Sequence, residues 1–292
     1  MFLKKWQDSL QRLRTGDYSV WPSHEFILSG KPGCAVPTPT FGYPIWDGSE
    51  KPITLLVNAD FGMGDTIQFY RFIPEAQKRV KRLILRCDED FKSIFPSVEV
   101  ISANDPPPEF DEIIHMMALP GVLGSEINGV PYLSPNYEEK FRDSFNVLDV
   151  MKFTKIGICW SGNPFNPRDR VRSIPVEMFK PWTDAGMKFF SLNKIVAPPE
   201  GFFDMRSYMS NWNQTAYLLT YFDLIISVDT AVAHLAGAMG AQTALLLPTT
   251  PDWRWKDEGS KTVWYDSMQI FRQKAEGDWS ELLSRLWKLL HS

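Results

Sequence analysis

The chain has 292 residues, of which 44% are hydrophobic and 23% charged, with a formal net charge of −4 and a pI of about 5.7. This length suits two domains of roughly 100–150 residues each, and the composition is that of a globular protein with a sizeable core. The acidic balance provides no general attraction to nucleic acid or to an acidic membrane. No stretch approaches about 18 uninterrupted apolar residues, so we expect no membrane span.

The cysteines and the first residues indicate the compartment. Cys34, Cys87 and Cys159 lie far apart, without the spacing of metal ligands. An odd number of unpaired cysteines is typical of reduced thiols. The start of the chain, MFLKKWQDSL, lacks the apolar run of a signal peptide. Together these features predict a cytoplasmic protein.

The N-terminal region has two parts. Residues 1–14 can form one short amphipathic helix with its apolar side chains near one face. Residues 15–52 are rich in Gly, Pro and aromatic side chains and show no sustained period, which predicts an ordered loop wrapped over a domain surface. The helix and the aromatic side chains could also mediate a homodimer.

A first alternation of strands and helices begins near Ile53. Strands are predicted over 53–58, 83–86, 98–101 and 112–115, and helices over 67–80, interrupted at Pro74, and 88–95. Alternation at this spacing favours a parallel, doubly wound sheet. A connector over 131–153, containing one helix, then leads to a second alternation.

The second alternation runs to the C-terminus. Strands are predicted over 155–160, 188–192, 224–228 and 243–247, and helices over 176–185, 215–221, 231–239 and 279–290. We therefore predict an α/β protein with two Rossmann-like domains whose parallel sheets face each other across a cleft, where ligands of such folds bind. The predicted division is 1–44 for the N-terminal helix and loop, 45–150 for the first domain and 151–292 for the second.

The stretch from Asp223 to Trp255 contains the strongest local signal for a ligand site. A buried strand over 224–228 ends at Asp229 and Thr230, and a helix of small residues begins at Ala231. A helix N-terminus at the carboxyl end of a parallel strand offers free N–H groups and a partial positive charge to an anion. The alternative is that Asp229 and Thr230 merely cap the helix, as in any strand–helix unit.

A glycine-containing turn follows the first predicted strand. Gly62 and Gly64 would let the backbone turn tightly and approach a ligand, and Asp65 and Thr66 fall at a helix start. The turn does not match the dinucleotide-binding pattern, because Ile67 stands where a glycine would be needed for continuation. Asp65 is either the N-cap of that helix or a general base facing the cleft.

Basic residues follow two strands of the second domain. The loop from Trp160 to Pro175 includes the cations Arg168, Arg170 and Arg172 and the polar residues Ser161, Asn163 and Asn166. Such a loop at the carboxyl edge of a sheet could hold a diphosphate, or it could be a solvated charged loop. Lys194 follows another strand and either reaches the same cleft or lies at the surface.

Other titratable residues have simpler interpretations. His234 is predicted to be a core histidine with satisfied hydrogen bonds, and His24 and His115 have no partner at metal-ligand spacing. The run from Cys87 to Asp90 contains an acid-x-acid triplet. Because it precedes an apolar helix, capping by the acidic side chains is favoured over metal binding. No nucleophile elbow, P-loop or zinc set is present.

Several segments of the chain resemble a known enzyme family. They are PIWDG, GMGDTIQFYRFIP, CWSGNPFNPRDRVRSIP, FFSLNK, DLIISVDTAVAHLAGAMG, LLLPTTPDWRW, WYDSMQIFRQ and GDW, in that order. The chain from about residue 45 to 292 resembles the glycosyltransferase-B enzymes related to bacterial heptosyltransferases, which form glycosyltransferase family 9. It is most similar to the branch often appended to tetratricopeptide repeats.

The resemblance implies inverting glycosyl transfer from a nucleotide-diphosphate sugar, without a metal or other cofactor. It places the donor mainly on the C-terminal domain and the acceptor on the N-terminal one, beside the loop that contains Gly62, Gly64, Thr66 and Gln68. Asp65 is similar to the family's candidate base. The residues similar to donor- and phosphate-binding positions are Ser161, Asn163, Arg172, Ser173, Lys194, Asp229, Thr230 and Ala231.

The chain also departs from the family pattern. Only residues 1–30 stand where relatives often carry several repeats, and the turn reads NADFGMGD, in which Asp60 replaces a more usual glutamate. The acceptor is therefore open between a glycan, a protein and a small molecule, and the acidic pI disfavours nucleic acid. A catalytically silent module that binds a nucleotide or a partner protein is the alternative function. A nucleotide-sugar epimerase would need additional acid and base residues that do not stand out.

Overall fold

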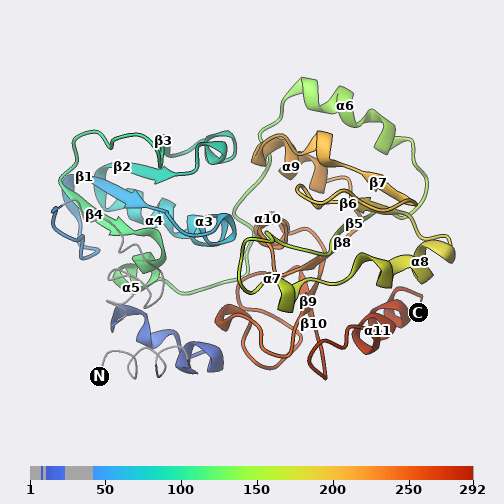
Figure 1. Cartoon of the computed structure of the whole chain (residues 1–292). Coiled ribbons are helices and arrows are strands. Elements are labelled where there is room, and N and C mark those ends of the chain that lie inside the picture. The colour runs from blue at the N-terminus through green and yellow to red at the C-terminus, as the bar shows by residue number, and fades with distance from the viewer. Residues whose placement is uncertain (1–7, 9–10, 24–41, 292) are drawn as a thin grey trace. The chain divides into compact units, whose positions relative to one another are not determined.

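The computed structural model describes residue 8, residues 11–23 and residues 42–291. The chain divides into two compact units (Figure 1): Met1–Asn128 with Trp253–Lys256, and Gly129–Asp252 with Asp257–Ser292. Most of the helix predicted over 1–14 and residues 24–41 of the wrapping loop lie outside the described residues. Residues 129–150, which the sequence analysis assigned to the first domain, lie in the second unit.

The first unit is built on a four-stranded parallel sheet. Its strands are β1 (Lys51–Asn58), β2 (Val80–Cys87), β3 (Glu99–Ser102) and β4 (Glu112–His115). They lie in the order β3-β2-β1-β4, so the direction of strand addition reverses between β1 and β4. All four strands were predicted, and β1 and β2 begin earlier than expected. Val57 and Leu85 pair in register near the middle of the sheet, and both are fully buried.

Short helices connect these strands. They are η1 (Tyr18–Ser23), α3 (Met63–Phe69), η2 (Tyr70–Phe72), α4 (Ile73–Lys78), η3 (Glu89–Ser93), η4 (Met116–Ala118) and α5 (Leu119–Leu123). Pro74 stands in the first turn of α4, which explains the predicted interruption. The helix expected over 88–95 is instead the 3-10 helix η3. Asp88 accepts a hydrogen bond from the Asp90 N–H, as the capping interpretation predicted.

The second unit contains a six-stranded parallel sheet. Its strands are β5 (Ile156–Cys159), β6 (Phe189–Ser191), β7 (Phe202–Asp204), β8 (Leu224–Val228), β9 (Thr243–Leu247) and β10 (Met268–Arg272). Their order is β10-β9-β8-β5-β6-β7. The direction of strand addition reverses between β5 and β8, which are parallel, and this switch point is where doubly wound folds bind ligands. The edge strands β7 and β10 were not predicted.

The helices of the second unit are α6 (Glu139–Asp149), α7 (Asp169–Arg172), η5 (Val176–Phe179), α8 (Lys180–Asp184), η6 (Arg206–Tyr208), α9 (Trp212–Leu219), α10 (Ala231–Met239) and α11 (Ser280–Leu290). The single helix expected over 176–185 is divided into η5 and α8, with Pro181 in the first turn of α8. The helix α9 begins three residues before the predicted Thr215, because the Asn211 side chain accepts a hydrogen bond from Gln214 N–H and caps it.

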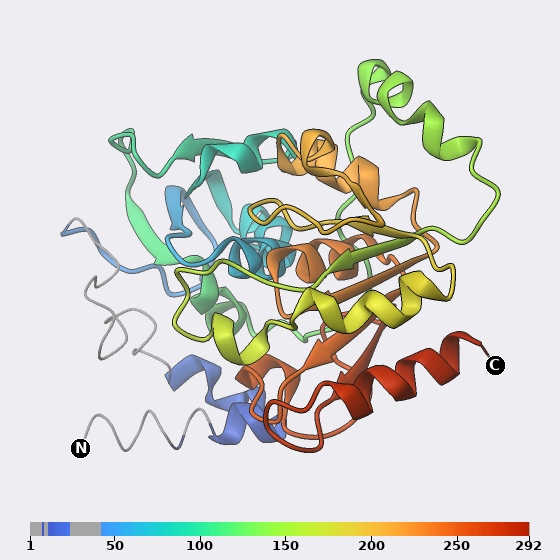
Figure 2. The ribbon, with the colours of Figure 1, turned by 45° about the vertical axis from the view of Figure 1, so that its right-hand side comes forward.

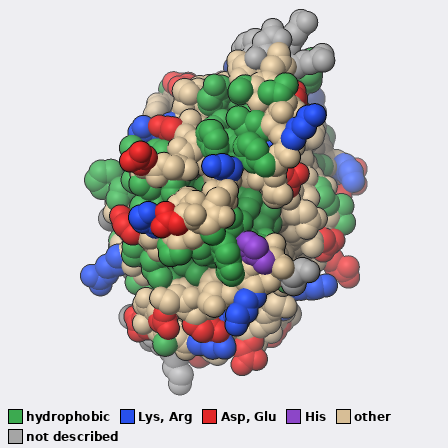
Figure 3. Space-filling view, turned by 90° about the vertical axis from the view of Figure 1, so that its right-hand side faces the viewer, with side chains coloured by type: hydrophobic (Ala, Val, Ile, Leu, Met, Phe, Trp, Pro, Cys, Tyr) green, Lys and Arg blue, Asp and Glu red, His purple; other side chains and the backbone are tan. Residues whose placement is uncertain are grey.

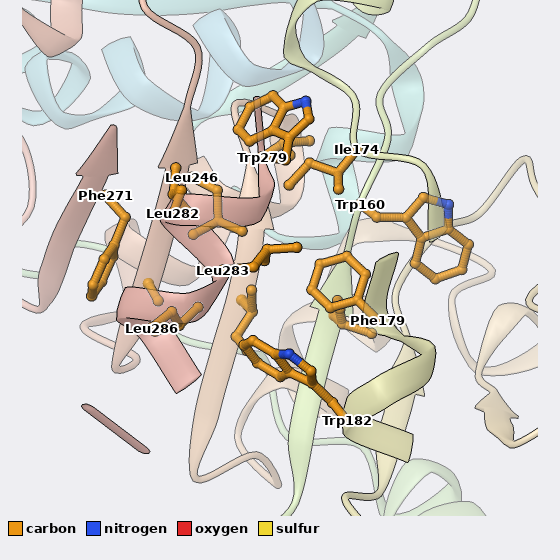
Figure 4. Packing of buried hydrophobic residues seen from close by; sticks show 14 of the residues in the cluster. Trp160, Ile174, Phe179, Trp182, Leu246, Phe271, Trp279, Leu282, Leu283 and Leu286 are labelled. Carbon is orange, nitrogen blue, oxygen red and sulfur yellow. The ribbon is translucent and has the colours of Figure 1, made fainter. Parts of the chain in front are cut away.

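The main core of the second unit lies between its sheet and two helical segments. Figure 2 shows α8 and α11 near each other along one face of the sheet. Apolar side chains of these helices and of η5 pack against those of the strands, and Figure 4 shows Phe179 of η5 and Trp182 of α8 opposite Leu283 and Leu286 of α11. The rings of Phe179 and Trp182 meet edge-on at 5.7 Å. Burial of these large side chains fixes the strands whose carboxyl ends carry the candidate site.

Hydrophobic side chains also reach the surface. Figure 3 views the molecule from the right-hand side of Figure 1 and shows them gathered in the middle of that face, among charged side chains. Within the described residues, no helix is both long enough and apolar enough to cross a membrane.

Candidate functional site

The switch point of the second sheet is formed by the ends of β5 and β8. The elements β8, α10 and β9 have the predicted bounds. Thr230 is the N-cap residue of α10, but its hydroxyl lies 3.1 Å from Ser227 Oγ and 3.6 Å from Cys159 Sγ and does not cap the helix. The first bond of the helix joins His234 N–H to Thr230 O. The N–H groups of the first turn, from half-buried Ala231 onward, come before this first helical hydrogen bond. Such N–H groups at a helix N-terminus suit an anion.

Arg172 is fixed beside this helix N-terminus. Its Nη1 donates to the carbonyl oxygen of Asp229 at 2.7 Å, and its Nε donates to Asp169 Oδ1 at 3.1 Å. The Arg172 side chain is 18% exposed, so most of its length is packed. An arginine held in this way presents its remaining N–H groups in a fixed direction.

Asp169 organises the loop that carries Arg172. It is 9% exposed and receives hydrogen bonds from Gly162 N–H at 3.1 Å and from the Ser173 hydroxyl at 3.0 Å, as well as from Arg172. Sequence reasoning did not select Asp169; the available signal was a single acidic residue in a loop of arginines and asparagines. The predicted phosphate-binding residue Ser173 uses its hydroxyl hydrogen within this cluster.

Gly162 lies against the same guanidinium. A Cβ atom at this position would fall 2.3 Å from Arg172 Nη2 and 2.6 Å from Asp169 Oδ1. No side chain fits such a space without moving the arginine. The loop therefore requires glycine here for close approach to Arg172, with no left-handed backbone involved.

A second buried polar residue joins two loops at this edge. Asn193 is 3% exposed and donates through Nδ2 to Ser161 O at 2.9 Å and to Ser161 Oγ at 2.7 Å, while its Oδ1 accepts from Trp160 N–H. Sequence reasoning selected its neighbour Lys194 instead. Lys194 is exposed, and no hydrogen bond or ion pair to it is found among the described residues. Asn193 thus positions Ser161, and Lys194 stands at the surface of the same edge.

The outer part of the loop after β5 is exposed. Asn163 accepts a hydrogen bond from Phe165 N–H, and Asn166 accepts one from Arg168 N–H, so both amides stabilise turns. Arg168 Nη2 donates to Thr250 O at 2.8 Å. Arg170 is exposed, and the Phe165 side chain is 89% exposed. The structure therefore separates a fixed cation, Arg172, from a solvated outer loop.

His234 is a core residue, as predicted. It is 3% exposed, and its Nδ1 lies 2.8 Å from the hydroxyl oxygen of Tyr265. Its Nε2 lies 3.7 Å from Asp229 Oδ1. Gly237, one turn further along α10, lies directly on the Tyr265 ring, because a Cβ there would be 2.4 Å from Cγ of the ring. These contacts hold α10, and therefore its N-terminus, in place.

The switch point of the first sheet has different chemistry. His115 at the end of β4 is 1% exposed, and its Nε2 lies 2.9 Å from Asp60 Oδ1. The other ring nitrogen, Nδ1, accepts the Met117 N–H, which leaves the ring proton on Nε2 for donation to Asp60. Asn58 donates to Asp60 Oδ2 at 2.9 Å, and Arg86 donates to Asn58. Asp60 is therefore held through both carboxylate oxygens.

The pKa of Asp60 reflects competing effects. Burial raises the pKa of its carboxyl group. The hydrogen bond and charge interaction with His115, followed by the hydrogen bonds from the Asp60 backbone and the Asn58 side chain, together lower the pKa by more than burial raises it. The net result is a pKa below the ordinary value for aspartate. Sequence reasoning noted Asp60 only as a departure from the family, and it left His115 without a partner.

The predicted base Asp65 lies in the first turn of α3, on the loop that follows β1. The N-cap residue is Gly62, so the capping alternative for Asp65 is wrong. Gly62 is exposed and Gly64 half-buried, whereas Thr66 and Gln68 are buried. Neither glycine has a positive φ angle: Gly62 is the N-cap with a φ of −64°, and Gly64 lies within α3. The Asp65 carboxylate forms an ion pair with Arg254, which also belongs to the first unit.

The described residues form no candidate metal site, and their cysteines are not activated. Across the residues that the structure describes, no three or more His, Cys, Asp or Glu side chains gather in a way that could hold a metal ion. Cys87 and Cys159 are free and buried, and burial raises their pKa to about 12 and about 11. Such thiols are poor nucleophiles at neutral pH. Cys34 lies outside the described residues.

Comparison with known proteins places the fold. No protein-family model and no curated protein sequence matches the chain. Among solved structures it is similar to a glycosyl transferase of family 9 from Veillonella parvula DSM 2008, with 10% identity, a TM-score of 0.53 and coverage of 82% of this chain and 90% of that one. It is also similar to the E. coli ADP-heptose LPS heptosyltransferase II, with 13% identity, a TM-score of 0.51 and coverage of 82% and 100%.

A third similar structure is the iron-containing dodecameric glycosyltransferase TibC from enterotoxigenic E. coli H10407. The identity is 12% and the TM-score 0.54, with 80% of this chain and 66% of that chain covered. At identities this low, the likeness establishes the fold, which is the α/β fold with two parallel sheets found in glycosyltransferases of family 9. The similarity to the repeat-bearing branch rests on the sequence motifs alone.

Proposed function

We propose that the protein is an inverting glycosyltransferase that moves a sugar from a nucleotide-diphosphate sugar to an acceptor hydroxyl, without a metal ion. The observation that carries this proposal is the fixed guanidinium of Arg172 beside the N-terminus of α10. As the bond between the anomeric carbon and the diphosphate breaks, negative charge grows on the leaving group. A held cation and free helix N–H groups stabilise that charge without needing to reorganise.

The first unit supplies the opposite chemistry. Asp65 is 21% exposed on its side chain and lies at the carboxyl edge of the first sheet. In the proposed reaction it takes the proton of an acceptor hydroxyl as that oxygen attacks the anomeric carbon. The fold likeness to a family 9 glycosyl transferase and to an ADP-heptose-dependent enzyme supports a nucleotide sugar as the donor. A hexosyl or heptosyl group fits this class.

The remaining parts of the proposal concern setting and partners. We place the protein in the cytoplasm, because its two described cysteines are free and reduced thiols persist there. The acceptor class stays open between glycans, proteins and small molecules. A homodimer and independence from other cofactors remain predictions from the sequence.

The test is a binding screen by calorimetry and thermal shift with UDP, GDP, ADP, CMP and dTDP and their common sugar conjugates. We expect one nucleotide to bind selectively to the wild type, and Arg172→Ala to weaken it about 10- to 100-fold, as for loss of a charge-assisted hydrogen bond. Asp65→Asn should keep that binding and lose nearly all transfer. Absence of binding across the panel would instead favour the silent, partner-binding module.

A further inference from the structure

The segment Trp253–Lys256 carries a sequence motif to which the proposed function assigns no role. It contains the 3-10 helix η7 (Trp253–Trp255) and packs with the first unit, although the chain on both sides belongs to the second. Trp255 is 1% exposed. Lys256 ends the turn with a φ angle of 58°, and it is the only residue other than glycine with a positive φ angle in the described part of the chain. A backbone held in that region indicates that the surrounding contacts determine the turn.

Trp253 is supported by the N-terminal region. Its ring meets that of Trp21, in η1, edge-on with the centroids 5.3 Å apart. Trp21 is 4% exposed, packs against Phe69 of α3, and donates its indole N–H to Met117 O at 2.7 Å. The N-terminal segment Tyr18–Ser23 therefore packs behind η7 within the same unit.

Arg254 contacts both the Trp253 ring and Asp65. The carbon centre of its guanidinium lies 5.1 Å from the centroid of the Trp253 ring, within the range of a cation–π contact. Its Nη2 donates to Asp65 Oδ1 at 2.5 Å. The side chains are 10% and 21% exposed, so the pair is shielded from much of the solvent. Contacts on two sides hold the guanidinium in one place.

The second oxygen of Asp65 faces a glycine. A Cβ atom on Gly62 would lie 3.3 Å from Asp65 Oδ2, tighter than an ordinary contact. Rotation about the last bond of an aspartate side chain is soft, so an unheld carboxylate samples a broad range of orientations. With Oδ1 bound to Arg254, Oδ2 is directed to the space that the missing side chain of Gly62 leaves open.

We propose that Arg254 is a positioning residue for Asp65, held in place by Trp253 and by Trp21 of the N-terminal segment. This inference rests on the proposed function, because Arg254 has this role only if Asp65 is the base. In the reaction the O–H bond of the acceptor breaks and its proton goes to Asp65 Oδ2. The acceptor oxygen bonds to the anomeric carbon, and the nucleoside diphosphate leaves with the electron pair of the broken bond. Arg254 touches no reacting atom.

The experiment measures donor turnover and donor binding separately in the full-length chain. The probe is the nucleotide sugar that binds the wild type, with water as the acceptor and release of nucleoside diphosphate as the readout. We expect Arg254→Gln to lower kcat about 10- to 100-fold, since small misplacements of a catalytic group have effects of that size. The donor dissociation constant should stay within about twofold, because Arg254 does not contact the donor. Arg254→Lys should recover part of kcat.

Two further variants separate positioning from a loss of folding. Gly62→Ala leaves the ion pair in place but crowds Oδ2, so it should also lower kcat without weakening donor binding. In the Asp65→Asn background, Arg254→Gln should cause no further loss, because a positioning residue acts only through the group it positions. The matched control is Arg82→Gln, which breaks an exposed ion pair with Glu99 in the same unit and should leave kcat unchanged.

The outcomes distinguish this inference from the proposed function. A wild type that binds and turns over no nucleotide sugar refutes the proposed function, and the inference falls with it. A wild type that turns over donor while Arg254→Gln keeps or exceeds its kcat refutes the inference alone, and an increase would identify the ion pair as inhibitory. Weakened donor binding in both Arg254 variants would move Arg254 into the donor site and also refute it.

Discussion

The two sheets share a strand order around their switch points, yet the side chains at those points have opposite character. In the first unit the edge between β1 and β4 carries the acids Asp60 and Asp65, each held by a basic or polar partner. In the second unit the edge between β5 and β8 carries a helix N-terminus and the cation Arg172, whose partners are Asp169 and the Asp229 carbonyl. The same topology therefore presents held carboxylates in one unit and a held guanidinium beside a helix N-terminus in the other.

The comparison shows how little of this chemistry belongs to the fold itself. Doubly wound sheets place loops and helix N-termini at the carboxyl edge, but the loop sequence decides which charge stands there. Both units also fix their functional groups with buried neighbours: His115 and Asn58 hold Asp60, and Asn193 holds Ser161. Such partners reduce the motion of a site residue before any substrate arrives.

The largest expected effect comes from filling the space at Gly162. In Gly162→Ala the new methyl group would collide with Arg172 Nη2 and Asp169 Oδ1 and displace the guanidinium. We expect affinity for the nucleotide to fall about 10- to 100-fold, equivalent to a charge-assisted hydrogen bond of about 1.5–3 kcal/mol. Calorimetry on the wild type and the variant measures it. Unchanged affinity would show that Arg172 does not face the donor and would remove the contrast between the two edges.

The next largest effect concerns the packing of α10 against Tyr265. In Gly237→Ala the methyl group would enter the Tyr265 ring, and overpacking of this kind costs about 1–3 kcal/mol of stability. We expect a lower midpoint of thermal unfolding, with the proposed nucleotide site still formed. An equally stable Gly237→Ala variant would mean that α10 can shift on the sheet, contrary to a fixed anion site.

The sequence was most informative where hydrophobic runs were short and nearly unbroken. In β8 the apolar residues Leu224, Ile225, Ile226 and Val228 form a short run with only Ser227 between them. Polar residues bound this run and a helix of small residues follows, so this region was predicted to the residue. The edge strand β7 of the second sheet was missed for a physical reason. β7 has three residues, and Phe203 and Asp204 are exposed, so its pattern is too short and too polar for a buried strand. Edge strands lack the two-sided burial that produces the signal.

Site residues divide in a similar way. Arg172 and Asp65 were selected as candidates because each stands in a loop or turn after a predicted strand, where the chain must emerge at the carboxyl edge, and their roles stay predictions. Asp169 and Asn193 were missed, since their importance arises from loop closure that the spacing does not encode. The pairing of Asp65 with Arg254 joins positions 189 residues apart. Local sequence patterns carry no information about a contact at that separation.

The smallest expected effect is the pH dependence of the stability that the contacts of Asp60 provide. Because the folded pKa of Asp60 is lowered, the stability that its contacts provide is present above its unfolded pKa of about 3.9 and is lost as pH falls through the folded value. Asp60 is partly solvent-exposed, so this contribution should be no more than about 1 kcal/mol. We therefore expect Asp60→Asn to lower the midpoint of thermal unfolding at pH 7, and the difference from the wild type to shrink below about pH 4.

Asp105→Asn is the matched control, since Asp105 lies at an exposed turn of the same unit. It removes one carboxylate without a buried partner, so its difference from the wild type should stay near zero at every pH. His115→Gln should reproduce part of the Asp60 effect, because the ring proton on Nε2 is the main donor to that carboxylate. If Asp60→Asn instead gave a constant difference from pH 7 to pH 3, its cost would be steric. Packing, and not charge, would then fix Asp60 in place, as packing fixes α10. The two switch points would differ in the charge that they carry but not in the interactions that order them.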